Sequence, residues 1–277
     1  MKSCFDTVNA LFPTAETEVR NSASRTDGYW KYVQHNKEPP LEFTYGEFPL
    51  DSFARVVDRA FDIFPTARTF LDMGSGAGRL ATLASIMYPF EHCRGIEILN
   101  SLHDLALSIQ GAASIDRVSN IDYICGSWSD PYLFFGDADI TFVYSSCLGT
   151  EQLHDLAKSL GRQLKVGAVV ITTEFPLPPA SPPSSYSFEI KDSFDVENSL
   201  VGGKSTVYIH TATSTGYYDG LKEWMETTKP SDDELAAIAA IKDIEDRYNP
   251  GFEIFKRNYQ NNCIFHGLPE FLYKNEN

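Results

Sequence analysis

The stretch that decides the fold is RTFLDMGSGAGRL, residues 68–80. Its apolar first half is typical of a short buried strand that ends at Asp72, and a helix is expected to begin at Arg79. Between them lies a turn rich in glycine, which lets the backbone bend tightly and approach a ligand closely. The first amides of the helix then face that ligand. Strand, glycine turn and helix in this order indicate a nucleotide-binding site.

A second acid follows about twenty residues downstream, the spacing at which ribose-binding acids occur. Residues 93–98 are predicted to form another apolar strand, with Glu97 at its C-terminal end. A carboxylate there accepts hydrogen bonds from ribose hydroxyls. The glycines expected to shape the cofactor turn are Gly74, Gly76 and Gly78.

Two classes of nucleotide compete for this turn. In the dinucleotide motif the third glycine comes three residues after the second, whereas here it comes two residues after. Asp72 would also repel a pyrophosphate, but it suits the sulfonium and α-ammonium groups of S-adenosylmethionine. The D-x-G-S-G-x-G form looks like motif I of class I methyltransferases, so S-adenosylmethionine is favoured over a nicotinamide or flavin cofactor. A glycine turn without a ligand is the third interpretation.

An alternation of strands and helices surrounds this motif. Strands are predicted at 69–73, 93–98, 121–125, 139–144 and 168–173, and helices at 49–64, 78–88, 100–110 and 150–162. The strands are apolar on both faces, as buried parallel strands are, and the alternation predicts a doubly wound α/β sheet. Strand-like runs at 186–190 and 205–211 fit the antiparallel hairpin that closes a seven-stranded, Rossmann-like class I methyltransferase sheet.

The chain of 277 residues is long enough for one large domain with an appendage. We expect a helical and loop lead-in over 1–48, which supplies a loop over the cofactor, and a methyltransferase core over 49–215. The third part, 216–277, is predicted to be a helical appendage, because a capping box precedes an apolar stripe there.

The composition of the chain limits the classes of partner that we expect. A formal net charge of −15 argues against direct binding to nucleic-acid phosphates. It suits a basic protein partner, and it serves equally to keep the protein soluble. No apolar run reaches transmembrane length, and the first residues lack a signal-peptide core, so no membrane partner and an intracellular location are expected.

The five cysteines show no C-x-x-C spacing, which predicts reduced thiols and no metal site.

Six segments together resemble one family, and they run in the family order over roughly residues 28–212. The segments are TYGEF (44–48), FLDMGSGAGRL (70–80), GIEI (95–98), CGSW (125–128), FVYSSCLG (142–149) and SLVGGKSTVYIHTA (199–212). In them the chain resembles the disruptor-of-telomeric-silencing (Dot1-like) family of non-SET histone lysine methyltransferases. Many class I methyltransferases share motif I and GIEI, whereas the Y-G-E element and the Y-x-H-T strand are more particular to this family.

The resemblance implies how the cofactor is held. Tyr45 would contact the methionine end, Asp72 would bind the α-ammonium and Glu97 the ribose. From the residues themselves, Trp128 can stack on the adenine ring and Arg79 can reach the cofactor carboxylate.

The acceptor side has its own candidates. Ser145 or Ser146 stands at the C-terminal end of the fourth strand, the usual place for a catalytic group in such sheets. The resemblance implies that Tyr208 lines the channel for the target lysine. His210, which alternates with Tyr208, is expected to be structural.

The chain departs from the family pattern in several places. Gly126-Ser127-Trp128 stands where Gly-Asp-Phe is usual, Ser145-Ser146 replaces an Asn-Asn pair, and Arg79 replaces a glutamine. The basic segment by which family members hold nucleosomal DNA is absent. Three functions therefore stay open: a histone lysine methyltransferase in the nucleus, a class I methyltransferase acting on a small molecule or another protein, and an inactive binding module.

Overall fold

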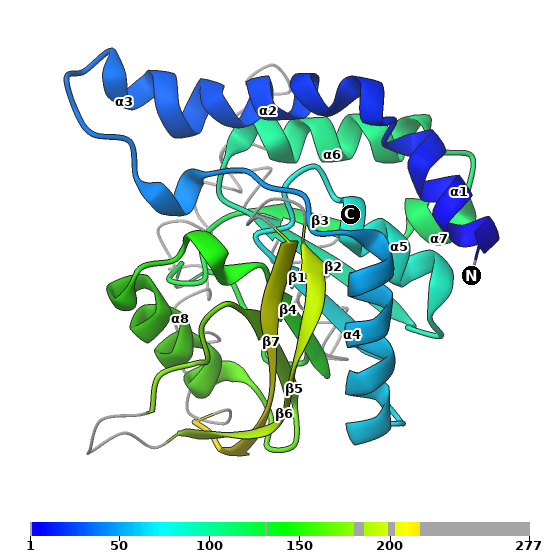
Figure 1. Ribbon diagram of the computed structural model, residues 1–277, viewed down its shortest axis with the longest axis vertical. Helices are drawn as coiled ribbons and strands as arrows, with labels where there is room; N and C mark the ends of the chain where they lie inside the picture. Colours follow the sequence, from blue (N-terminus) through cyan, green and yellow to red (C-terminus); the bar gives the residue numbers. More distant parts are fainter. Residues whose placement is uncertain (1, 131, 180–185, 199–202, 217–277) are drawn as a thin grey trace, which may run out of the picture.

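The computed structural model describes residues 2–130, 132–179, 186–198 and 203–216. These residues form a twisted sheet with helices on both of its faces (Figure 1). The predicted appendage lies outside the described residues except for residue 216, and the division of the chain at residues 48 and 215 stays a prediction.

The sheet has seven strands in the order β3-β2-β1-β4-β5-β7-β6. Its strands are β1 (Thr69–Met73), β2 (His92–Glu97), β3 (Ile121–Cys125), β4 (Ile140–Val143), β5 (Val169–Thr173), β6 (Ser187–Asn198) and β7 (Gly203–Ser214). The first five in spatial order are parallel, and β7 lies antiparallel between β5 and β6. The predicted seven-stranded α/β fold is confirmed, although its last two strands are longer than expected.

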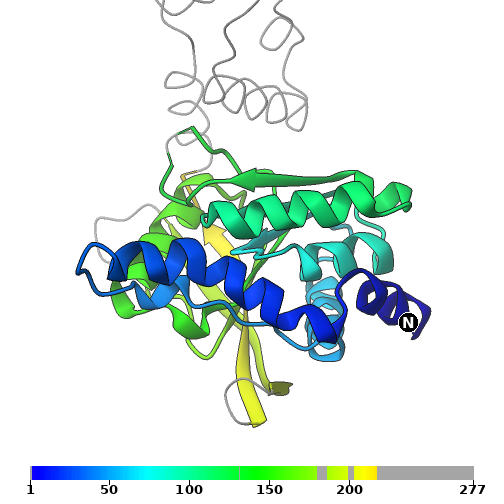
Figure 2. The same ribbon diagram turned by 90° about the horizontal axis from the view of Figure 1, so that it is seen from above.

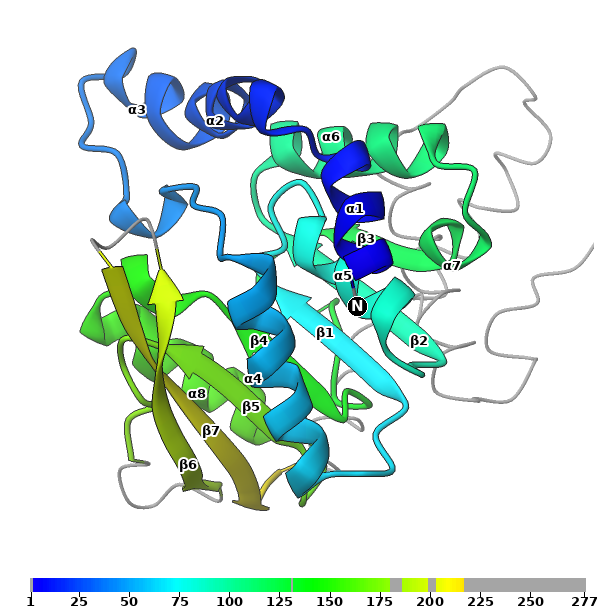
Figure 3. The same ribbon diagram turned by 45° about the vertical axis from the view of Figure 1, so that its right-hand side comes forward.

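One face of the sheet carries α4 (Leu50–Ile63), α5 (Arg79–Met87), α6 (Asn100–Ala112) and α7 (Asp116–Ser119), together with α1 (Lys2–Leu11) (Figure 3). Helix α4 buries Phe53, Val56, Val57 and Ala60, the spacing of a single apolar stripe. Phe70 of β1 lies in the same buried cluster. This packing fixes the strand that leads into the glycine turn.

The opposite face is covered by α8 (Thr150–Gln163). It buries Leu153, Leu156, Ala157 and Leu160 in a second cluster. Leu71 lies in that cluster, because neighbouring residues of a strand point to opposite faces. Both faces of β1 are therefore buried, as predicted for a parallel strand inside the sheet.

The lead-in is more helical than the sequence predicted. After η1 (Thr14–Glu16), helix α2 (Thr17–Arg25) continues through a π-helical turn, η2 (Thr26–Trp30), into α3 (Lys31–Val33). Helix α2 and the turn η2 lie along α6 (Figure 2). The Asp27 carboxylate accepts hydrogen bonds from the Ser101 amide (2.8 Å) and hydroxyl (2.7 Å) at the start of α6. Two short 3₁₀ turns, η3 (Leu41–Phe43) and η4 (Ser145–Cys147), lie near the carboxyl ends of the strands.

The other predictions about the chain concern cysteines, metals and membranes. The cysteines at positions 4, 93, 125 and 147 are free thiols, as predicted, whereas Cys263 lies outside the described residues. Among the residues described, no three metal-ligating side chains gather. None of the helices in this part of the chain is both long and apolar enough to cross a bilayer.

Candidate active site

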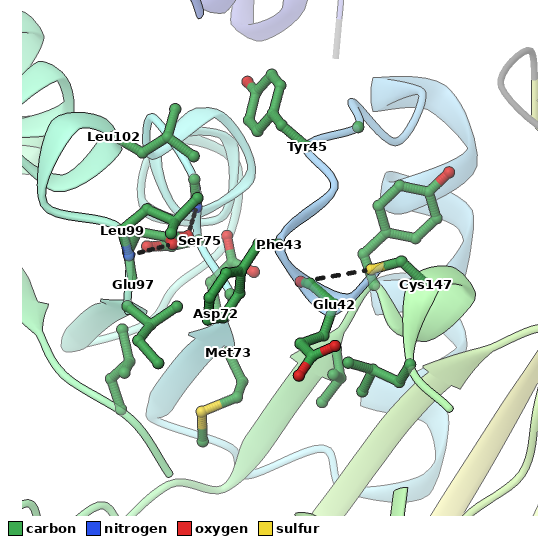
Figure 4. A pocket seen from close by; sticks show the side chains of 18 of the residues that line it. Glu42, Phe43, Tyr45, Asp72, Met73, Ser75, Glu97, Leu99, Leu102 and Cys147 are labelled. Carbon is green, nitrogen blue, oxygen red and sulfur yellow. Dashed lines mark hydrogen bonds between the residues drawn. The ribbon is translucent and has the colours of Figure 1, made fainter. Parts of the chain in front are cut away.

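A pocket of about 580 Å³ opens at the carboxyl ends of β1, β2 and β4. Such a volume suits a cofactor-sized ligand, and this edge of an open α/β sheet is where ligands bind. Its walls come from segments far apart in the sequence (Figure 4). They are residues 42–48, the glycine turn, the residues that follow β2, β3 and β4, and one side of α8.

The glycine turn is required by backbone geometry. Gly74, Gly76 and Gly78 have φ of +83°, +55° and +88°, conformations that strain any residue with a Cβ. Gly74 and Gly76 line the pocket, whereas Gly78 does not. A Cβ at Gly78 would overlap the hydroxyl of Tyr123, so this glycine permits close packing at the start of α5.

Glu97 braces that turn. One of its carboxylate oxygens accepts the Gly76 amide at 2.8 Å and the other accepts the Leu99 amide at 2.8 Å (Figure 4). Burial raises the pKa of Glu97, and the backbone hydrogen bonds oppose that rise. A carboxylate oxygen can accept more than one hydrogen bond, so a ribose hydroxyl can still be held here. The ribose contact itself stays a prediction.

Asp72 lies at the end of β1 on the floor of the pocket, with only 2 % of its surface exposed. Burial, and next the charge of Glu97, raises the pKa of Asp72 to about 7. A cation placed in the pocket would favour the ionised form. A buried acid at the end of β1 fits the positively charged methionine end of S-adenosylmethionine. The contact of Asp72 with the α-ammonium stays a prediction.

The upstream loop closes over the glycine turn. A Cβ on Gly76 would lie 2.6 Å from Cε2 of Tyr45, so the tyrosine ring lies directly on the turn. The Tyr45 hydroxyl donates to Oε1 of Glu47 at 3.0 Å. Arg79 lines the same pocket, and its Nη1 donates to the carbonyl of Phe48 at 3.0 Å. The predicted cofactor residues Tyr45, Asp72 and Arg79 are thus brought together.

Trp128 also lines the pocket, on the side that follows β3. It is half-buried, and its neighbour Ser127 shares a hydrogen bond with the Ser129 hydroxyl at 3.0 Å. A serine supplies no carboxylate for an adenine amine. The ring of Trp128 is an aromatic face of this wall on which a base could stack.

The two serines after β4 differ in position. Ser146 lines the pocket, whereas Ser145 is fully buried and does not. The Ser145 hydroxyl donates to the Thr173 carbonyl at 2.7 Å and accepts the Thr173 amide at 2.9 Å. Ser145 therefore joins η4 to the end of β5, and of the two predicted catalytic serines only Ser146 lines the pocket.

The candidates on β7 lie away from the pocket. Tyr208 pairs with Thr172 on one side and Ser193 on the other, and it is not among the residues that line the pocket. His210 is buried; its Nε2 accepts the Leu177 amide at 3.1 Å. Burial lowers the pKa of His210 to about 4, so a neutral ring is held between backbone groups. His210 is structural, as expected.

Sequence reasoning missed one wall of the pocket. Glu42, Cys147, Gln152 and Asp155 line it from η3, η4 and α8. Gln152 donates to Oε1 of Glu42 at 3.4 Å, and the Cys147 thiol points to the Glu42 carbonyl (Figure 4). Gln152 and Asp155 are three residues apart on a helix and so share a face, a spacing that a sequence shows but does not orient.

A family model described as "Histone methylation protein DOT1" matches residues 34–176. The chain belongs to the Dot1 family. The match spans more than half of the chain and includes the Y-G-E loop, the glycine turn and both serines after β4. The resemblance that the sequence motifs predicted is thereby confirmed.

The chain is also distantly similar to one curated protein and to solved structures. A release factor glutamine methyltransferase of Aliivibrio fischeri is 29 % identical over 93 residues, 33 % of this chain and 32 % of that protein. The chain thus spans about a third of the length of this curated relative. A mutant of MtNAS solved with S-adenosylmethionine is 12 % identical over 76 % of each chain, with a TM-score of 0.46. Geranyl diphosphate C-methyltransferase from Streptomyces coelicolor A3(2), solved with S-adenosyl-L-homocysteine, is 19 % identical over 43 % of this chain and 45 % of that one, with a TM-score of 0.36.

The cofactor predicted from the sequence, S-adenosylmethionine, agrees with the Dot1 family assignment and with the acidic floor of the pocket. Tyr45, Asp72 and Glu97 would hold it. Their individual roles toward it stay predictions.

Proposed function

We propose that this Dot1-family protein transfers a methyl group from S-adenosylmethionine to a lysine side chain of a basic protein, with histones as the first candidates. One observation carries the proposal: the pocket is lined by five acidic side chains and one basic side chain. The acids are Glu42, Glu47, Asp72, Glu97 and Asp155, and the base is Arg79. A cleft of predominantly negative charge raises the local concentration of cations, which suits both a sulfonium cofactor and a lysine.

Glu47 is paired with Arg20, and the other four acids divide between the two ends of the pocket. Asp72 and Glu97 are buried at the floor, where the cofactor is expected. Asp155 is exposed and Glu42 is half-buried on the wall formed by α8 and η3. We assign this second pair to the mouth, where it would meet a protonated lysine and the basic residues beside it.

The bound cofactor would supply a methyl group already activated by the positive charge on sulfur. The chain must then align the acceptor nitrogen behind that methyl, and positioning of this kind supplies much of the rate in such reactions. A lysine must also arrive as the neutral amine. Apolar walls such as Met73 and Leu148 lower the pKa of an amine that leaves water, and Ser146 offers a hydroxyl to orient it.

The net charge of −15 favours a basic protein that is not wrapped in DNA. Free histones are therefore better candidates than intact nucleosomes, and a nuclear location belongs to this proposal. A test is to incubate the purified full chain with methyl-labelled S-adenosylmethionine and separate samples of free core histones and nucleosomes. We expect label on lysines of free histones, and its loss in Asp72→Ala.

A pair of matched variants tests whether the acids at the mouth of the pocket bind the histone. Glu42→Gln should raise the KM for the histone and leave the Kd for S-adenosylhomocysteine unchanged. Glu38→Gln removes an exposed acid outside the pocket and should change neither. Binding of S-adenosylhomocysteine without label on any lysine would contradict the lysine assignment.

The same experiments separate the other functions that the sequence left open. Label on a small molecule or on a non-histone protein would identify a different class I methyltransferase. A folded wild-type protein that binds no S-adenosylhomocysteine would be a binding module that keeps the fold.

A further inference from the structure

Arg20 is a buried arginine outside the pocket. It comes from α2, and only 2 % of its surface is exposed. Its Nη1 donates to the Pro13 carbonyl at 3.2 Å and its Nη2 to the Thr17 hydroxyl at 3.0 Å. Its Nε forms an ion pair with Oε1 of Glu47. The guanidinium is therefore fixed in place, and it reaches the loop that closes over the cofactor turn.

Glu47 is shared unequally between two arginines. Its Oε1 receives Arg20 and also the Tyr45 hydroxyl, at 3.0 Å. Its Oε2 lies 3.9 Å from Nε of Arg79, which is too long for a hydrogen bond. Burial acts to lower the pKa of Arg20, but the hydrogen bond and the charge of Glu47 outweigh it, so that pKa is raised. The negative charge of Glu47 is therefore largely taken up by Arg20.

Arg79 keeps part of its positive charge uncompensated. Its Nη1 donates to the Phe48 carbonyl, but its buried Nε donates to no acceptor among the described residues. Its side chain lines the cofactor pocket beside the glycine turn. A carboxylate on a bound ligand would accept hydrogen bonds from this guanidinium, because arginine binds carboxylates through paired N–H groups.

We propose that Arg20 is a positioning residue for the cofactor: by neutralising Glu47 it leaves Arg79 available for the cofactor's carboxylate. It also holds Glu47 under the Tyr45 hydroxyl, so the tyrosine ring stays on the glycine turn. The inference rests on the proposed function in one respect, that the ligand carries the amino-acid group of S-adenosylmethionine.

Removal of Arg20 changes the balance of charge in a defined way. Glu47 would then have Arg79 as its nearest cation, at 3.9 Å, and a rotation of either side chain would close that gap. Arg79 would be withdrawn from the ligand. The loss would fall on the carboxylate end of the ligand and leave the adenosine end unaffected.

Two ligands separate these ends. S-adenosylhomocysteine carries the amino-acid group, whereas 5′-methylthioadenosine keeps the adenosine and the thioether sulfur but lacks that group. Calorimetric titration of Arg20→Met, which keeps an apolar stem in the buried site, should show S-adenosylhomocysteine weakened by about tenfold or more, the equivalent of one charged hydrogen bond. The affinity for 5′-methylthioadenosine should change by less than about twofold.

A double variant and a control complete the test. Arg20→Met with Glu47→Gln removes the freed carboxylate as well, so it should recover most of the lost affinity for S-adenosylhomocysteine. Arg25→Met removes an exposed arginine of the same helix, paired with Glu18, and should leave both affinities unchanged.

The outcomes are distinct. Unchanged binding in Arg20→Met, equal weakening of both ligands, or no recovery in the double variant would overturn the positioning role of Arg20. If the folded wild-type protein binds neither ligand, the proposed function fails and the inference with it. A residue that only supports the fold is not expected to weaken S-adenosylhomocysteine alone, nor to have that affinity recovered in the double variant.

Discussion

Replacement of Asp72 by asparagine should stabilise the cofactor-free protein while it removes cofactor affinity. Asp72 is buried, and burial followed by the charge of Glu97 raises its pKa from 3.8 to about 7. A raised pKa means that the folded protein holds the proton more tightly than the unfolded chain. Ionisation of Asp72 therefore works against the fold, and asparagine removes that cost.

The size and sign of the effect follow from the shift. About 3 pH units at 1.36 kcal/mol each amount to about 4 kcal/mol of destabilisation above pH 7. The cost builds up from pH 3.8, the unfolded value, to pH 7 and is then constant. The advantage of Asp72→Asn in unfolding free energy should thus be about 4 kcal/mol at pH 8, about 2 kcal/mol at pH 5 and about 0.5 kcal/mol at pH 4.

Urea unfolding of the wild type and Asp72→Asn at pH 8, 5 and 4 measures this difference directly. Asp104→Asn, at an exposed position of α6, serves as the control and should follow the wild type. Titration with S-adenosylhomocysteine should show that Asp72→Asn has lost its affinity. A variant that is less stable than the wild type at pH 8, or a difference that does not change with pH, would refute the reasoning.

Three further predictions concern other parts of the site and core. Gly76→Ala should bind S-adenosylhomocysteine at least about tenfold more weakly than Gly74→Ala. Both glycines have a positive φ, but only a methyl group at Gly76 would meet an aromatic ring, at 2.6 Å from Cε2 of Tyr45. Calorimetric titration of both variants measures the difference in affinity. Ser145→Ala should lose about 1–3 kcal/mol of unfolding free energy through its two buried hydrogen bonds, whereas Ser146→Ala should keep its stability and change turnover. Burial lowers the pKa of His210 to about 4, so the unfolding free energy should fall by about 3 kcal/mol between pH 6.5 and pH 4. Urea unfolding of His210→Gln should not show this loss.

The core of the fold could be predicted because its signals are local. Strands β1 to β5 are short segments bounded by turn residues, and the predicted strands differ from them by at most about one residue at each end. The positive φ of Gly74 and Gly76 is what their place in the motif requires. Glu97 was placed correctly because its position depends only on where β2 ends.

The parts that sequence reasoning missed depend on tertiary contacts. Helix α2 buries Arg20 and Ser24, so it has little of the apolar periodicity by which helices are recognised. The 3₁₀ turn η4 decides which of Ser145 and Ser146 faces the pocket, and a motif does not show that choice. Tyr208 was assigned by resemblance, whereas its place in the sheet follows from the register of β7.

The two acids that we assign to the mouth of the pocket could not be predicted for the same reason. Glu42 and Asp155 come from segments far apart in the sequence, and each alone is an ordinary surface acid. Only the folded chain shows that they share a wall with Ser146. Their meaning for a basic substrate rests on that juxtaposition.

We expect this pocket to bind the amino-acid end of the cofactor at Asp72 and its ribose at Glu97. The most direct measurement is a crystal structure of the protein grown with saturating S-adenosylhomocysteine. We expect the ligand in the pocket, with its α-ammonium against the Asp72 carboxylate, its ribose hydroxyls against Glu97 and its carboxylate at Arg79. Ligand density elsewhere on the protein, or an empty pocket at saturation, would contradict it.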